Sequence, residues 1–226
     1  SVASRGLGDV YKRQGPYQTS FDPASVRVAV HVDAGCGMDV DPQVAEVVRG
    51  AARAFEAAGA QVEEIAPFMD DELLSLIDLF WRVRSYNDLM KLSEEDRAHV
   101  LPYVVQWCEA GADVSGPELM DAYNSIHRMR KRTVSATEPY DLVLSPVAPV
   151  AAFPAEWPMP FNDPTQSMGH TSFTVPYNMS EQPASTVHAG YTDDGRTVGV
   201  QVAGRRFNDP FVLSASLWLE QALNVE

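Results

Sequence analysis

Between residues 26 and 65 the apolar positions change from a strand pattern to a helical pattern and back again. Val26–Val32 is rich in β-branched residues, which is typical of a buried strand. Asp41 is suited to cap a helix with Pro42 at its first position, and apolar residues then recur at helical spacing until Gly59. Gln61–Ile65 predicts a second strand. We therefore predict a strand–helix–strand unit with a right-handed, parallel crossover.

The next stretch predicts helices in succession. Asp70–Lys91 has acidic residues in its first turn and an apolar face at helical spacing. Glu94–Glu109 predicts a second helix that is broken or bent near Pro102. The pattern Ser-x-x-Glu at positions 115–118 is a capping box, which predicts a long helix ending near residue 137.

Short strands return near the end of the chain. Ser185–Ala189 and Val198–Val202 predict buried strands joined by a tight turn around Asp194-Gly195. Asp209 is expected to cap a final helix that runs to about residue 224. This order of elements predicts an α/β fold in which helices flank a mixed β-sheet. No internal boundary divides the chain into two domains.

A proline-rich segment follows a predicted buried strand at Asp141–Ser145. It contains VAPVAAFPAEWPMPFNDPTQ, with five prolines and no periodicity, which is typical of a long ordered loop. Its aromatic residues Phe153, Trp157 and Phe161 make the segment too apolar for a free linker. We predict that this loop packs over a pocket and that these three side chains line it.

Histidine and asparagine supply the other candidates for a pocket. Among the five histidines we expect His170 to be the one that lines a pocket, the alternative being a loop histidine bonded to the backbone. Asn178 is expected to shape its loop through backbone hydrogen bonds, and direct ligand contact is the alternative. His188 falls in a predicted buried strand and is expected in the core. His31 and Asp33 alternate along a strand and therefore point to opposite faces.

No motif within the chain carries catalysis by itself. We find neither a Gly-x-Ser-x-Gly elbow nor a His-Glu-x-x-His helix, and no set of residues with metal-ligand spacing. Gly35-x-Gly37 lacks a third glycine, and Asp39 and Asp41 would repel phosphate at the start of the helix. A nucleotide site is therefore not predicted at this loop.

The N-terminal residues are expected to be foreign to the protein. The segment SRGLGDVYKRQ, at positions 4–14, is the translation of a common transposon-based sequencing adapter. We therefore expect residues 1–14 to be an adapter-derived scar, so that the chain begins where a DNA fragment was cut. A signal peptide lost with the missing part stays possible on this interpretation.

Charge and cysteine content narrow the function classes. The net charge of −14 disfavours a nucleic-acid partner, because an acidic surface repels phosphate. No apolar run reaches the roughly 20 residues of a membrane-spanning helix. Cys36 and Cys108 lie far apart without metal-ligand spacing, so we expect reduced thiols, a cytoplasmic setting and a buried Cys108.

Segments in order along the chain resemble those of the amidase signature family. Asn178, Pro183 and Ala184 match an Asn-Leu-Thr-Gly-x-Pro-Ala segment, and the family's Pro-x-Gly-x-Gln-x-x-Gly segment matches in its glycine–glutamine–glycine part. The matching positions there are Gly199, Gln201 and Gly204. The segment DLVLSPVAP at 141–149 is similar to the family's Asp-Leu-Leu-Leu-x-Pro-x-x-Pro. The opening strand–helix–strand unit and the terminal helix fit as well.

The resemblance implies an amidase whose catalytic residues lie outside this chain. In the family one serine attacks the amide carbonyl, and a second serine in a cis peptide relays the proton to a lysine. No glycine–serine run of that kind is present here, so no catalytic residue is assigned. We therefore interpret residues 15–226 as the C-terminal part of a single amidase domain lacking the catalytic core segment, and expect it to be inactive alone.

For the intact protein the resemblance implies hydrolysis of a small carboxylic amide without a metal or organic cofactor. Two alternatives stay open: a relative of the amidotransferase subunit that acts as a glutaminase with a partner protein, and a noncatalytic α/β module that binds a small ligand. A homo-oligomer is also open. Because cutting a sheet exposes an edge strand and an apolar face, we expect the fragment to self-associate.

The sequence departs from the family pattern at four positions. Glu181 and Gln182 replace the usual glycine and its neighbour, Thr197 stands where proline is common, and His188 stands where proline often precedes glycine. These changes leave the expected fold intact. They affect the expected shape of the acyl pocket, and hence the expected substrate.

Overall fold

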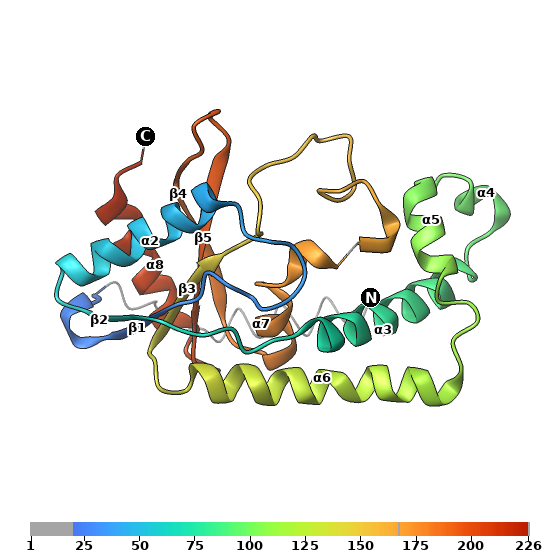
Figure 1. Cartoon of the computed structure of the whole chain (residues 1–226), viewed down its shortest axis with the longest axis horizontal. Helices are drawn as coiled ribbons and strands as arrows, with labels where there is room; N and C mark the ends of the chain where they lie inside the picture. The colour runs from blue at the N-terminus through green and yellow to red at the C-terminus, as the bar shows by residue number, and fades with distance from the viewer. Residues whose placement is uncertain (1–19, 167, 226) are drawn as a thin grey trace.

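The computed structural model describes residues 20–166 and 168–225, so the expectation for residues 1–14 lies outside the described part. The elements appear in Figure 1. Their bounds are η1 Pro23–Ser25, β1 Arg27–Val30, α2 Pro42–Ala57, β2 Gln61–Glu64, α3 Asp71–Leu89, α4 Glu94–Arg97, α5 Pro102–Glu109, α6 Gly116–Thr137, β3 Leu142–Pro146, η2 Pro164–Gln166, η3 Gly169–Thr171, α7 Val175–Ser180, β4 Ala184–Tyr191, β5 Thr197–Gly204 and α8 Asp209–Leu223.

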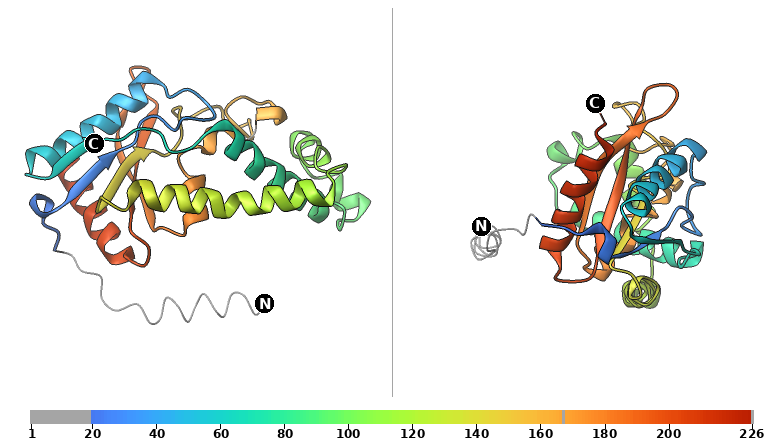
Figure 2. Two further views of the ribbon diagram at one scale, coloured as in Figure 1. Left: turned by 60° about the horizontal axis from the view of Figure 1, so that its bottom comes forward. Right: turned by 90° about the vertical axis from the view of Figure 1, so that its left-hand side faces the viewer.

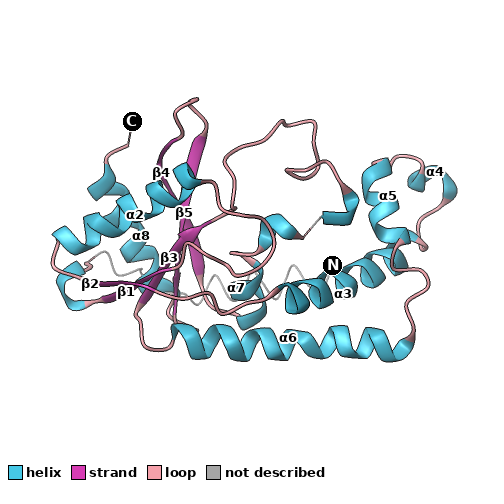
Figure 3. Ribbon diagram, in the orientation of Figure 1, coloured by secondary structure: helices cyan, strands magenta, loops and turns pink. Residues whose placement is uncertain are grey.

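The five strands form one mixed sheet in the order β2-β1-β3-β5-β4. β1 is parallel to both β2 and β3, whereas β5 is antiparallel to β3 and to β4. The β1–α2–β2 unit is the predicted parallel crossover, and Asp41 caps α2 with Pro42 in the first turn. Figure 3 shows the strands gathered at one end of the molecule, with α3, α4 and α5 at the other. The expected α/β class with a mixed sheet is confirmed.

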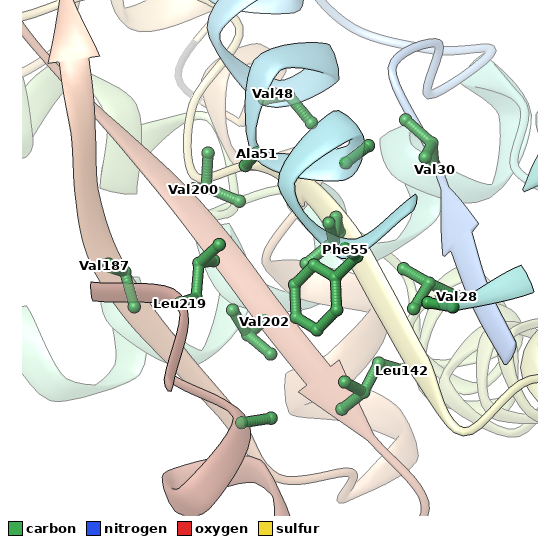
Figure 4. Close-up of a cluster of buried hydrophobic side chains, with 14 of the residues drawn as sticks. Val28, Val30, Val48, Ala51, Phe55, Leu142, Val187, Val200, Val202 and Leu219 are labelled. Carbon is green, nitrogen blue, oxygen red and sulfur yellow. The ribbon is translucent and has the colours of Figure 1, made fainter. Parts of the chain in front are cut away.

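Helices α2 and α8 cover one face of the sheet and form the main core with it. Alternate residues of β1, β3 and β5 point into this layer because side chains of a strand alternate between faces. Phe55 of α2 is fully buried and packs at 4.6 Å, between ring centroids, from Trp218 of α8. Figure 4 shows how side chains from both helices and four strands point toward one another in this core.

Helix α7 packs on the opposite face of the sheet. Tyr177 of α7 lies there with Val143 of β3 and Ala203 of β5. The buried amide of Gln201 donates to the hydroxyl of Ser145 and to the carbonyl of Phe173, both at 2.9 Å. These two bonds satisfy a buried polar side chain and join β5, β3 and the entry to α7.

A helical arm extends from the sheet and consists of α3, α4, α5 and α6 (Figure 1 and Figure 2). The predicted capping box at the start of α6 is present, since Ser115 and Glu118 each bond the other's backbone N–H. The predicted break falls at Pro102, which begins α5. Just after α5, a side chain at Gly111 would come within 2.8 Å of the backbone of Arg82, so glycine permits α5 to lie closely on α3.

Three expectations for the C-terminal region were wrong. Asn178 lies in helix α7 rather than in a loop, because Pro176 is well placed in the first turn of a helix. β4 is an edge strand in which only Val187 is buried, so His188 is exposed rather than in the core. The N-cap of α8 is Asn208, and Asp209 is the first helical residue, where its charge favours the helix dipole.

Glu181 shows how the chain accommodates one departure from the family pattern. It ends α7 in the left-handed conformation, with φ of 60°, a region that favours glycine. Its carboxylate pairs with Arg130 at 2.7 Å and also with Arg206. The position where the family usually has glycine therefore adopts the left-handed backbone that glycine favours. In this chain, ion pairs with two arginines hold a glutamate in that conformation.

We predict that Glu181→Gly is more stable than Glu181→Ala by about 1 kcal/mol, because only alanine keeps the left-handed strain. Both substitutions remove the two ion pairs, so the difference between them isolates the backbone effect. Urea denaturation of the two variants measures it. Equal free energies of unfolding would show that the strain at this position is negligible.

His31 is a buried histidine on the α7 side of the sheet. It is fully buried, and its ring stacks on Phe68 with centroids 4.5 Å apart. Neither ring nitrogen makes a hydrogen bond of ordinary geometry. Burial lowers the pKa of His31 to about 4, and the charge and backbone of Asp33 oppose that effect only in part.

This shift predicts a loss of stability in acid. The unfolded chain binds a proton at residue 31 below about pH 6.5, whereas the folded chain does so only near pH 4. Lowering the pH from 6.5 to 4 therefore favours unfolding by about 3 kcal/mol through this residue. In His31→Phe, which keeps an aromatic ring beside Phe68, the fall measured by urea denaturation across this range should be smaller by that amount. Identical pH profiles would contradict the prediction.

Candidate functional site

Clefts lie where the segments after the parallel strands meet. The loop after β1, the approach to α3 after β2 and the long loop after β3 all begin at the carboxyl ends of the parallel strands. This is where ligands bind in α/β proteins. The loops are joined directly. The N–H of Asp41 donates to the carbonyl of Pro149 at 2.8 Å, and that of Met38 to the carbonyl of Gly169 at 3.2 Å.

The first cleft is acidic. It has a volume of about 560 Å³ and adjoins a second of about 440 Å³ that follows the loop at 32–40. Asp39 and Asp71 line both. The N–H of Gly35 donates to Asp33 at 2.8 Å and that of Gly37 to Asp71 at 2.9 Å. Because carboxylates already accept from these two N–H groups, neither N–H is available to bind an anion.

Cys36 lies in this acidic loop but is not poised as a nucleophile. Its thiol is free and buried. Burial and then the neighbouring carboxylates of Asp71, Asp70 and Asp33 raise its pKa to about 12. The thiolate, which is the reactive form of cysteine, is therefore scarce at neutral pH. Cys108, the other cysteine, is buried as expected.

A second kind of cleft is apolar and has a volume of about 530 Å³. We call it the tryptophan cleft, and it is lined by Trp81, Trp107, Met159, Met168, Val175, Asn178 and Met179. Met168 lines both this cleft and the acidic one. The lining comes from α3, α5, α7 and the long loop, so its shape depends on how these segments are held together.

Arg82 holds together three of the segments that line the tryptophan cleft, namely α3, α5 and the long loop. Its side chain, only 11% exposed, pairs with Asp78 at 2.5 Å within α3. It donates to the carbonyls of Pro164 at 2.8 Å and of Trp107 at 3.4 Å, and it lies over the Trp107 ring. The indole N–H of Trp107 in turn donates to Asp78 at 3.1 Å. The ring of Trp107 is thus fixed by its polar edge, which leaves apolar ring surface to line the tryptophan cleft.

The five candidate pocket residues lie at different places. Phe161 lines the acidic cleft and Asn178, exposed on α7, lines the tryptophan cleft. Phe153, 38% exposed, lines a third cleft of about 240 Å³ beside β5. Trp157 is 40% exposed and His170 is half-buried in η3, and neither lines these clefts. The assignment of all five to one substrate pocket stays a prediction.

Sequence reasoning missed the residues that build the tryptophan cleft. Helical spacing puts Trp81 on the apolar face of its helix, but nothing in the sequence pairs it with Trp107 on α5. One available signal is the spacing of Asp78 and Arg82, four residues apart on a helix, which favours an ion pair. That spacing does not reveal the further bonds of Arg82 to other segments.

The two lysines of the described residues lie outside the linings of the clefts. Lys91 is paired with Asp88 on an exposed helix end, and Lys131 is exposed on α6. Within residues 20–166 and 168–225 no group of three or more histidine, cysteine, aspartate or glutamate side chains is arranged to hold a metal ion. In the same ranges, no helix is both long and apolar enough to cross a membrane.

Comparison with known proteins gives a consistent family. The amidase family model matches residues 12–213. An acylamidase from Rhodococcus erythropolis is 33% identical over 198 residues, which cover 85% of this chain and 41% of that protein. A glutamyl-tRNA(Gln) amidotransferase subunit from Chromobacterium violaceum is 29% identical over 210 residues, covering 86% and 43%. The chain thus spans about two fifths of the length of these curated relatives.

Solved structures share the fold. A 6-aminohexanoate cyclic dimer hydrolase in complex with its substrate superposes with a TM-score of 0.76 at 23% identity, over 92% of this chain and 47% of that one. A bacterial aryl acylamidase superposes with a TM-score of 0.70 at 25% identity, over 87% and 43%.

We predict that Arg82→Met lowers the free energy of unfolding by about 3 kcal/mol, because it removes the shared partner of Asp78 and of three carbonyls, those of Trp107, Pro164 and Thr165. Arg53→Met is the matched control. Arg53 pairs with Glu46, but both side chains are largely exposed, at 59% and 62%. Its loss should cost less than about 1 kcal/mol. Urea denaturation compares the two, and equal losses would show that Arg82 is no more than a surface ion pair.

Proposed function

The chain belongs to the amidase family, and we propose that it is the C-terminal part of an enzyme that hydrolyses a small, non-peptide carboxylic amide. The observation that carries the proposal is the family match, which runs through nearly the whole chain and includes each segment around the clefts. On this proposal residues 15–226 supply part of the sheet and one wall of the substrate site.

The catalytic groups of the proposed enzyme come from a segment outside this chain. By family resemblance, a serine attacks the amide carbonyl carbon and the C–N bond breaks, which gives an acyl-enzyme and releases ammonia or an amine. Water then releases the carboxylic acid. A second serine and a lysine move the protons, and backbone N–H groups bind the oxyanion. No metal or organic cofactor takes part in this scheme.

Within the described residues, this chain's contribution is to bind and to exclude water. The long loop after β3 brings Phe161 to the acidic cleft and Met159 to the tryptophan cleft. Tyr103 of α5 donates to the carbonyl of Asp163 at 2.9 Å and so holds the loop to the helical arm. A wall held in place in this way can orient a substrate beside catalytic groups supplied by the other segment.

A glutaminase component of an amidotransferase is the second candidate, and it rests on the similarity to glutamyl-tRNA(Gln) amidotransferase subunits. It predicts a site for the charged groups of glutamine and also a partner protein. None of the four clefts described above is lined by a lysine or arginine that could pair with the carboxylate of glutamine, which favours the first candidate. A noncatalytic ligand-binding module is the third, and it predicts ligand binding without hydrolysis.

We predict that the 226-residue chain releases no ammonia or amine from carboxylic amides, whereas a protein extended to include the family's two serines and lysine does. The source DNA upstream of residue 15 gives the first test. A Gly-Gly-Ser-Ser-Gly-Gly-Ser-like segment in frame, with a lysine before it, is expected. Ammonia release is then measured for both proteins.

Two results would contradict this proposal. An upstream region without the serines and the lysine would favour the noncatalytic module. Hydrolysis by the 226-residue chain itself, at a rate that survives further purification, would place catalytic groups within this chain.

A further inference from the structure

The tryptophan cleft combines small-molecule size with an apolar lining. Its volume of about 530 Å³ falls within the usual range for small-molecule sites. Two indoles, three thioethers and one valine face a single amide side chain, that of Asn178. Methionine side chains adapt to irregular apolar groups, and indoles offer broad apolar faces.

Its shape is set before any ligand arrives. Trp107 is held by Asp78 through its N–H and by Arg82 across its ring. Arg82 also bonds the carbonyls of Pro164 and Thr165 in the long loop. The neighbouring Trp81 lies under the guanidinium of Arg84, 5.0 Å from its ring centroid. Both indoles are therefore oriented by polar groups that do not belong to the lining of the cleft, and a ligand need not order them.

The charge of the lining decides what the cleft can accept. None of its seven side chains is charged. A carboxylate placed there would lose its water without gaining a cationic side chain from the lining, which is costly. Transfer of an uncharged ring or alkyl chain from water into the cleft is favourable. Each methylene buried should raise the affinity about fourfold.

We propose that the tryptophan cleft receives the uncharged ring or alkyl chain of an amide substrate, so that the substrates are apolar amides rather than amino-acid amides such as glutamine. That the bound molecule is a substrate rests on the proposed amidase function. That the cleft binds apolar groups does not. Asn178, an exposed residue of α7, lies in the lining of the cleft.

Calorimetric titration of the 226-residue chain with acetamide, butanamide, hexanamide and glutamine tests the binding step. Affinity should rise about fourfold with each methylene, and glutamine should not bind measurably. Asn178→Phe places a large ring at the cleft from an exposed position of α7 and should weaken hexanamide binding at least tenfold. Asn124→Phe, the same change at an exposed position of α6, should leave it unchanged.

Circular dichroism confirms that each variant is folded. If Asn178→Phe proves unfolded, Met159→Phe replaces it, with Met120→Phe on the exposed surface of α6 as its control. Equal affinity for acetamide and hexanamide, or equal binding by a folded cleft variant and its control, would overturn the proposal.

The extended protein separates this inference from the proposed function. If it hydrolyses amides and Asn178→Phe lowers the ratio of kcat/KM for hexanamide to kcat/KM for acetamide at least tenfold, both stand. If it hydrolyses amides and the variant affects both alike, the enzyme is an amidase but the cleft does not select its substrate. If it binds hexanamide without hydrolysing any amide, the cleft is confirmed as an apolar site and the proposed function is wrong.

Discussion

The guanidinium of Arg82 is the constraint on which the arrangement of the clefts depends. It neutralises Asp78 on its own helix, covers the ring of Trp107 on α5 and bonds two carbonyls of the long loop. Lysine does not replace such a group, because a planar fork of five N–H donors can reach several acceptors at once. Three segments remote in sequence thereby share one partly buried ion. Gly111 completes the contact by letting α5 approach the backbone of α3.

Features with local causes were predicted from the sequence. Asp41 with Pro42, and Ser115 with Glu118, contain their own helix-start signals, and both helices begin there. The parallel crossover follows from the order of elements and chain chirality. The degree to which β4 is buried has no such local cause. Residues 185–189 were predicted to form a buried strand, but the strand lies at the edge of the sheet, so His188 is exposed. Which strand becomes the edge is decided by pairing across the whole chain.

The candidate site was predicted in the same uneven way. The proline-rich loop was expected to cover a pocket because it is apolar, and its residues do line clefts. The approach of Trp81 and Trp107 to the same cleft could not be predicted, since it needs the connection through α4 that brings α5 back onto α3, and the bonds of Arg82. Glu181 shows the opposite case. Its departure from glycine was visible in the sequence, but only the left-handed backbone and the two arginines explain how it is accommodated.

The two main clefts differ in what their polar groups are already doing. In the acidic cleft, Asp71 holds the glycine loop and Asp78 holds Arg82 and Trp107, so these carboxylates serve the shape of the site. In the tryptophan cleft few lining side chains hold other segments in place, and its apolar surface is open to a ligand. Met168 borders both. Electrostatic interactions therefore fix the walls of the clefts, while the hydrophobic effect is available to bind a ligand. A substitution of Asp78 should therefore affect binding by moving Trp107, and a substitution of Asp71 by moving the glycine loop, rather than by removing a direct contact with the ligand.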